Sequence, residues 1–171
     1  AFSAGGVLVG SAYNQRRDLF DQIVLTNAFL DVYRTMMSRT ISGGSSHERD
    51  EFGHDEQELL ASCPVQTIGQ RQLSGIKTTS TTKFLLSCTL DDEQVPFRNS
   101  FEFGDRLLAW QEKHHQDDPS AATVNYWITE TGGHHLGVNR LHVCALEAAF
   151  ILGNANVPSN KENTNIGAQN Q

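Results

Sequence analysis

The sequence predicts an α+β fold in which an antiparallel sheet packs against a long N-terminal helix. Three observations lead to this prediction. A long amphipathic pattern stands early in the chain, later segments are rich in strand-forming residues, and helical patterns separate those segments. The strand segments are half polar, whereas strands of a parallel sheet are covered on both faces and read as apolar runs. We therefore expect an antiparallel sheet with two or three further helices.

The longest predicted helix covers residues 16–39. Apolar residues recur in it at three- and four-residue spacing from Leu19 to Met37, which is typical of a helix with one broad buried face. Asp18 lies in the first turn and Arg39 in the last, and both charges suit the helix dipole.

The middle of the chain predicts a short helix followed by two strands. The helix runs from about Asp55 to Ser62 and stops before a proline. Residues 66–90 contain many threonines, serines and large apolar residues, and we expect two antiparallel strands there with their turn at Ser74-Gly75. The acidic residues at 91–93 are interpreted as an exposed turn.

Three elements are predicted after that turn. Ser100 begins a helix that reaches about His115. Residues 122–131 alternate between apolar and polar side chains, which indicates a strand. Asn139 begins a last helix, which stops at Gly153.

The length of 171 residues predicts one domain with a segment at each end. Residues 1–15 are small and apolar and are interpreted as an N-terminal arm. Residues 16–153 form the globular α+β domain, and residues 154–171 form an Asn-rich polar tail whose composition is typical of segments that do not fold alone. The two end segments indicate a subunit that holds its neighbours in a homo-oligomer.

Charge and hydropathy exclude several classes of protein. The net charge of −7 argues against nucleic acid as the main partner. We also expect no membrane span, because no apolar run approaches ~18 residues. The three cysteines are far apart and odd in number, so they predict small core side chains rather than a disulfide framework. Nothing in the sequence indicates a compartment.

An acidic, histidine-bearing segment is the strongest candidate for a metal site. If residues 47–58 were helical, His47 and Glu51 would share a face, as would Glu51 and Asp55, with His54 close by. The spacing matches no established zinc motif. We interpret the segment as a solvated loop and expect no cofactor; if a divalent metal binds this chain, these four residues are its expected ligands.

A second group of histidines indicates a different site. His134 and His135 lie where the strand over 122–131 turns into the last helix, and functional groups often lie at such turns. His142 follows on that helix, and Asp117 precedes the strand. Together they predict the acid–base residues of a small enzyme of the lyase, isomerase or cyclase type, with a small-molecule substrate in a curved antiparallel sheet.

The function predicted first is nevertheless non-enzymatic. The sequence shows no Gly-x-Ser-x-Gly nucleophile motif, phosphate-binding loop or dinucleotide fingerprint. Together with the end segments and the Ser-, Thr-, Asn- and Gln-rich composition, this absence favours a self-assembling structural subunit of a coat, shell or filament. The small enzyme with a His/carboxylate pocket is the alternative.

Overall fold

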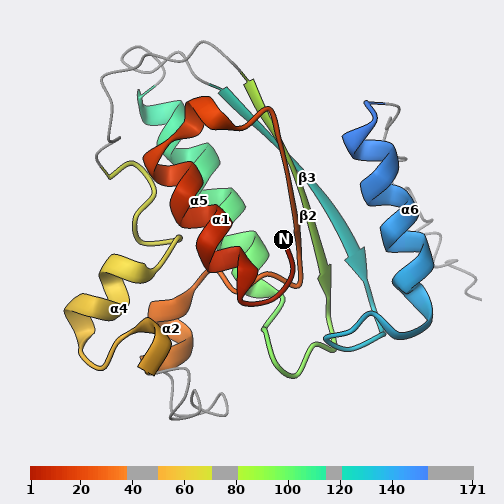
Figure 1. Ribbon diagram of the computed structural model, residues 1–171, viewed down its shortest axis with the longest axis horizontal. Helices are drawn as coiled ribbons and strands as arrows, with labels where there is room; N and C mark the ends of the chain where they lie inside the picture. The colour runs from red at the N-terminus through yellow and green to blue at the C-terminus, as the bar shows by residue number, and fades with distance from the viewer. Residues whose placement is uncertain (38–49, 71–80, 115–120, 154–171) are drawn as a thin grey trace, which may run out of the picture.

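The computed structural model describes residues 1–37, 50–70, 81–114 and 121–153 (Figure 1). Three strands and several helices alternate along these residues. In chain order the elements are α1 (Gly5–Gln15), the 3-10 turn η1 (Arg17–Leu19), β1 (Gln22–Thr26), α2 (Val32–Met37), α4 (Glu56–Ser62), β2 (Thr81–Thr89), α5 (Arg98–His114), β3 (Ala121–Thr129), the 3-10 turn η2 (Gly137–Asn139) and α6 (Arg140–Ile151).

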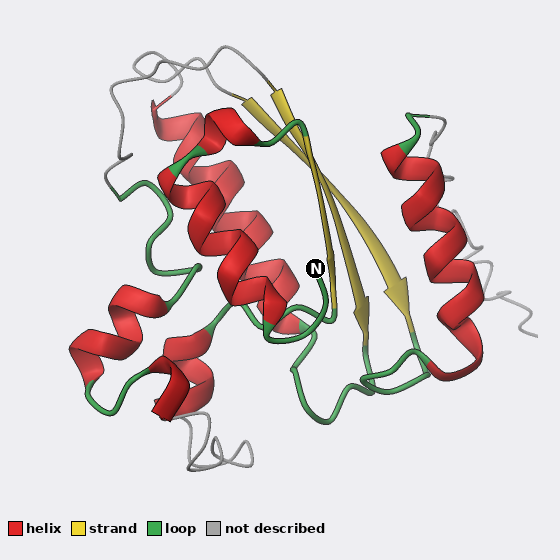
Figure 2. Ribbon diagram, viewed as in Figure 1, coloured by secondary structure: helices red, strands yellow, loops and turns green. Residues whose placement is uncertain are grey.

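The three strands form a parallel sheet in the order β1-β2-β3, so the prediction of an antiparallel sheet is wrong. Figure 2 shows α1 and α5 on one side of the sheet and α6 on the other. Every side chain of β2 from Phe84 to Thr89 is buried between these layers. The sequence of β2 looks half polar because it contains Thr82, Ser87 and Thr89, and all three are buried. Polar residues in this strand therefore do not indicate an exposed face.

The long helix predicted over residues 16–39 is also wrong. That stretch contains η1, β1 and α2 instead. In β1 the side chains of Ile23 and Leu25 are buried, and Val24 between them is partly exposed. A short buried strand followed by a short helix places apolar residues at spacings that also satisfy a helical pattern, and periodicity alone does not separate the two.

Residues 5–15, expected to lie in an arm, form helix α1 inside the domain. Tyr13 is only 2% exposed and its ring packs edge-on against Phe84, with 4.8 Å between the ring centroids. A Cβ atom on Gly6 would lie 2.8 Å from the Cβ of Ala28 and 2.9 Å from the carbonyl oxygen of Phe29. Glycine at this position therefore lets α1 pack directly against the segment that follows β1.

The two antiparallel strands predicted over residues 66–90 are also corrected: the described part of that range contains one strand, β2, and β2 pairs in parallel with β1 and β3. The helices predicted over 55–62, 100–115 and 139–153 and the strand predicted over 122–131 are confirmed within about two residues. Asp55 caps α4 by accepting a hydrogen bond from the backbone N–H of Glu58 at 2.9 Å. Helix α5, strand β3 and helix α6 follow as expected, and Gly153 ends α6 with a φ of 73°. The Ser74-Gly75 turn and the tail over 154–171 lie outside the described residues. Within the described part of the chain, no helix has the length and apolarity needed to cross a bilayer.

Candidate active site

Three segments that are far apart in the sequence meet at the carboxyl end of the sheet. Ser3 precedes α1, and its neighbour Phe2 forms a parallel bridge with Thr26, the last residue of β1. Asp92 follows β2, and His134 follows β3. The carboxyl ends of parallel strands share one edge of the sheet, and ligand and catalytic sites of such sheets lie there.

Hydrogen bonds connect the three side chains in a line. The Nδ1 atom of His134 lies 2.8 Å from Oδ2 of Asp92, and the Nε2 atom lies 2.9 Å from Oγ of Ser3. An ionised carboxylate only accepts hydrogen bonds, so Nδ1 carries the hydrogen and Nε2 accepts the hydroxyl hydrogen of Ser3. His134 is 6% exposed and the Asp92 side chain is 0% exposed. The imidazole is thus a shielded base aimed at the serine hydroxyl.

The carboxylate of Asp92 is fixed by the loop that carries it. Its Oδ1 atom accepts hydrogen bonds from the backbone N–H groups of Gln94 and Val95, both at 2.8 Å. Because Oδ1 is held by the backbone, Oδ2 stays available for His134. This arrangement sets the orientation of the imidazole ring as well as its tautomer.

Ser3 occupies a sharp turn between the bridge to β1 and helix α1. Its φ of 52° lies in the left-handed region, which is uncommon for residues other than glycine. Its N–H donates to Thr26 O at 3.2 Å, and its carbonyl oxygen accepts from the N–H groups of Gly6 and Phe29, each at 2.9 Å. These bonds hold the turn in place and present Oγ to His134. Strained residues of this kind cluster at active sites.

Open space lies beside the imidazole. A groove of about 590 Å³ is bordered by His134 and His135, by Glu93 and Gln94 from the loop after β2, and by Arg140 at the start of α6. The ring of Phe2 also contacts His134, with 4.8 Å between the ring centroids and an angle of 42° between the ring planes. The imidazole therefore has an aromatic neighbour and borders a groove.

Comparison with known proteins identifies the family. The sequence pattern of the prolyl oligopeptidase family matches residues 2–157. The chain belongs to the prolyl oligopeptidase family. It is 30% identical over 144 residues to the human protein named prolyl endopeptidase-like. The aligned region covers 80% of this chain and 19% of the human protein. The rat protein of the same name is 31% identical over 113 residues, covering 63% of this chain and 14% of the relative.

Solved structures of low sequence identity share the fold. An acylaminoacyl peptidase from Pyrococcus horikoshii aligns with a TM-score of 0.63 and 17% identity, covering 88% of this chain and 22% of that one. A carboxylesterase from Lactobacillus plantarum aligns with a TM-score of 0.52 and 17% identity, covering 89% of this chain and 57% of the carboxylesterase. The chain spans about a fifth of the length of the prolyl endopeptidase-like proteins of human and Macaca fascicularis.

Membership of this family corrects the functional prediction. The interpretation as a self-assembling coat, shell or filament subunit is wrong, because the family is one of peptidases and its pattern covers most of the chain. The alternative of a lyase, isomerase or cyclase in a curved antiparallel sheet also fits poorly, since the sheet is parallel. That prediction assumed a pocket lined by an antiparallel sheet, whereas the site lies at the carboxyl ends of parallel strands.

The structure separates the histidines that were predicted together. His134 lies in the hydrogen-bonded line, and His135 is exposed beside it, with 5.2 Å between their ring centroids. His142 is exposed on α6 and, in the part of the chain that the structure describes, forms no hydrogen bond with Ser3 or Asp92. Asp117 lies outside the described residues.

The candidate metal ligands do not converge in the described part of the chain. His54 pairs with Asp50 at 3.4 Å on the surface, Glu51 is exposed, and Asp55 serves as a helix cap. His47 lies outside the described residues. Among the residues that the structure describes, no group of three or more His, Cys, Asp or Glu side chains is placed to hold a metal ion.

Sequence reasoning missed Ser3 and Asp92. The signal for Ser3 is the Ser3-Ala4-Gly5 run, which fits the end of the Gly-x-Ser-x-Gly pattern with Ala1 in place of the first glycine. The strict pattern does not match here because residue 1 is alanine. The acidic residues at 91–93 indicate an exposed turn, whereas the structure buries the side chain of Asp92. The order serine, aspartate, histidine along the chain is the order found in α/β-hydrolases.

Proposed function

We propose that this chain supplies the catalytic triad of a serine hydrolase, with Ser3 as the nucleophile, His134 as the general base and acid, and Asp92 as the residue that orients the imidazole. The observation that carries the proposal is the continuous line of hydrogen bonds from Ser3 through His134 to Asp92. The left-handed backbone at Ser3 supports it, because a strained strand-to-helix turn exposes the hydroxyl of such a nucleophile.

The proposed reaction is acyl transfer. His134 Nε2 takes the hydroxyl proton as Ser3 Oγ attacks the carbonyl carbon of an amide or ester, and a tetrahedral intermediate forms. The bond to the leaving amine or alcohol then breaks, and the leaving group takes the proton from Nε2. Asp92 stays ionised throughout and stabilises the imidazolium that forms between these steps.

Hydrolysis of the acyl-enzyme repeats the sequence with water. His134 takes a proton from the water as its oxygen attacks the acyl carbon, and it returns that proton to Ser3 Oγ when the acid leaves. The N–H of Ala4 follows the nucleophile at the start of α1, where N–H groups lack partners within the helix. We assign to it one of the hydrogen bonds to the developing oxyanion.

The substrate class is proposed more broadly than the chemistry. The relatives are named as a prolyl endopeptidase-like protein, an acylaminoacyl peptidase and a carboxylesterase. Their names share the cleavage of an acyl group from an amine or an alcohol, and we carry only that shared reaction to this chain. The proposed chemistry uses side chains and backbone N–H groups of this chain and calls on no cofactor or metal.

Hydrolysis of p-nitrophenyl acetate tests the proposal. We expect a burst of p-nitrophenol of about one equivalent per chain as the acyl-enzyme forms, followed by slower turnover. The Ser3→Ala variant should lose both the burst and the turnover. A Ser11→Ala variant, which changes a serine of α1 outside the site, should keep both. Turnover that survives in Ser3→Ala would overturn the proposal.

The oligomeric state is a separate proposal. We propose that the chain forms a homo-oligomer, and native mass spectrometry at micromolar concentration tests it. A spectrum that contains only the 18.9 kDa monomer would overturn it.

A further inference from the structure

One buried side chain joins the segments that carry the triad. Asn27 directly follows β1, is 2% exposed and has a φ of 42°. Its Nδ2 atom donates to His134 O at 2.8 Å and makes longer contacts of 3.4 Å with Gly133 O and with Thr89 Oγ1. Its Oδ1 atom accepts from the backbone N–H of Thr89 at 3.0 Å. One amide group therefore contacts the end of β2 and the loop after β3.

The backbone around Asn27 connects to the third segment. The carbonyl oxygen of Thr26 accepts a hydrogen bond from Ser3 N–H at 3.2 Å, and Phe29 N–H donates to Ser3 O at 2.9 Å. Asn27 lies between these two attachments to the turn that carries Ser3, the serine turn. Residues 26–29 therefore hold Ser3 through the backbone. The Asn27 side chain holds the loop after β3 that carries Gly133 and His134, the histidine loop, and also β2, the strand that leads to Asp92.

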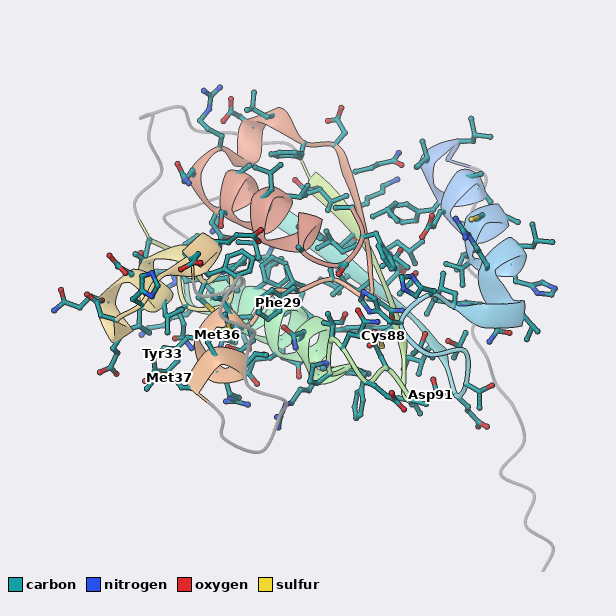
Figure 3. The ribbon with its side chains drawn as sticks, turned by 60° about the horizontal axis from the view of Figure 1, so that its bottom comes forward. Phe29, Tyr33, Met36, Met37, Cys88 and Asp91 are labelled. Carbon is teal, nitrogen blue, oxygen red and sulfur yellow. The ribbon has the colours of Figure 1, made fainter. Side chains whose placement is uncertain are left out.

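The histidine loop needs such an attachment. Gly132 and Gly133 adopt φ values of 135° and 61°, so the two residues before His134 have conformations that glycine takes without strain, and glycine also gives the loop freedom to move. Asp91, labelled in Figure 3, accepts from Gly133 N–H at 2.8 Å and from Gly132 N–H at 3.2 Å. Asp91 is exposed, whereas Asn27 binds the other side of the loop from the interior.

We propose that Asn27 is a positioning residue of the triad, which fixes the distance between His134 Nε2 and Ser3 Oγ by holding the histidine loop and the serine turn to the same point. This inference rests on the proposed function. Asparagine meets both requirements of the position: it tolerates the left-handed backbone, and it offers a donor and an acceptor at once. Aspartate keeps the acceptor for Thr89 N–H but has no donor for His134 O.

The variant that tests this inference is Asn27→Gly. Glycine adopts a φ of 42° without steric strain, so the change removes the side-chain amide and leaves the backbone conformation available. A displacement of about 1 Å at a catalytic group lowers the rate by ~100-fold. We expect kcat for p-nitrophenyl acetate to fall by about that factor while KM changes less than about threefold, because the substrate does not contact Asn27. Asn27→Asp should lower kcat by a similar factor.

Asn14 provides a matched control. It is also buried, at 3% exposure, and its Nδ2 atom donates to Pro64 O at 2.8 Å and to Thr67 Oγ1 at 3.0 Å, away from the triad. Asn14→Ala should lower the melting temperature but leave kcat within about threefold of the parent. Both variants are assayed at least 15 °C below their own melting temperatures, so that loss of folded protein does not enter kcat.

The outcomes separate this inference from the proposed function. If Ser3→Ala is inactive and Asn27→Gly keeps kcat within threefold, the positioning role is overturned and the triad stands. A loss of kcat in Asn14→Ala as large as that in Asn27→Gly also overturns it, because any buried asparagine would then have the same effect. Activity that persists in Ser3→Ala overturns the proposed function itself.

A spectroscopic measurement gives an independent readout. The ¹H NMR resonance of the His134 Nδ1 hydrogen, bonded to Asp92 at 2.8 Å, should shift or broaden in Asn27→Gly. It should stay at the position of the parent protein in Asn14→Ala. An unchanged resonance in Asn27→Gly would show that the imidazole keeps its place without the amide.

Discussion

Replacing Asp92 by asparagine tests the assigned order of the triad. The side chain is fully buried, and one of its oxygens already accepts two backbone N–H groups at 2.8 Å. In Asp92→Asn that oxygen keeps its bonds, so the new amide NH₂ faces His134 Nδ1. Two donors cannot share one hydrogen bond, and the imidazole changes to the tautomer with its hydrogen on Nε2. Nε2 then points a hydrogen at Ser3 Oγ and cannot accept the hydroxyl proton.

The expected cost is large in rate and small in stability. Loss of the correct tautomer in a serine triad lowers kcat by ~10⁴, equivalent to about 5.4 kcal/mol of transition-state stabilisation. A hydrogen bond to a charged group is exchanged for a neutral one, so the free energy of unfolding should change by only about 1 kcal/mol. Steady-state hydrolysis of p-nitrophenyl acetate and urea unfolding measure the two quantities on the same samples.

Asp91→Asn is the control for that experiment. Asp91 is adjacent in sequence but exposed, and it binds the N–H groups of Gly132 and Gly133 rather than the imidazole. We expect it to retain kcat within about tenfold. If Asp91→Asn loses ~10⁴ in kcat and Asp92→Asn does not, the assignment of the triad carboxylate is refuted.

Three further predictions concern stability. Gly6→Ala should destabilise the fold by about 1–3 kcal/mol because its Cβ would lie 2.8 Å from that of Ala28. The Cβ of Gly5→Ala would meet Ala1 Cβ at an ordinary contact distance of 3.5 Å, so this variant should be neutral or stabilising; equal urea midpoints for the two variants would contradict this. Burial raises the pKa of the Cys88 thiol to about 11. The unfolded thiol ionises first, so stability should fall as the pH rises from about 9 to 11, by up to ~1.4 kcal/mol per pH unit relative to Cys88→Ala; parallel pH profiles would count against it. Asp55→Ala should cost about 1 kcal/mol through loss of the helix cap, and an unchanged thermal midpoint would show that the cap contributes nothing.

Local patterns predicted the elements whose signals are local. The start of α4 near Asp55, the alternation along β3 and Gly153 as a helix end each depend on a few neighbouring residues, and each appears as expected. Strand direction does not have such a signal. Buried Ser87 and Thr89 gave β2 a half-polar appearance, although helices cover both faces of the sheet. Whether two strands run parallel depends on the connection between them, which the composition of a strand does not report.

The candidate site was predictable only in part. The position of His134 at a turn after a strand predicts a functional residue. Its hydrogen bonds to Ser3 and Asp92, however, span 131 and 42 residues of sequence. Such contacts arise from the order of strands in the sheet and leave no periodic trace. The helical pattern over residues 16–39 includes Asn27, whereas its left-handed backbone and its bond to His134 appear only in three dimensions.

Covalent labelling by a fluorophosphonate tests the central claim most directly. The reagent phosphonylates a serine only when a neighbouring base activates it, and tandem mass spectrometry locates the adduct. The triad predicts one adduct per chain on Ser3, none in Ser3→Ala, and labelling slowed by a factor of ~10³ or more in His134→Gln. An adduct on another serine, or equal labelling of the parent and of Ser3→Ala, would contradict the assignment of Ser3 as the nucleophile.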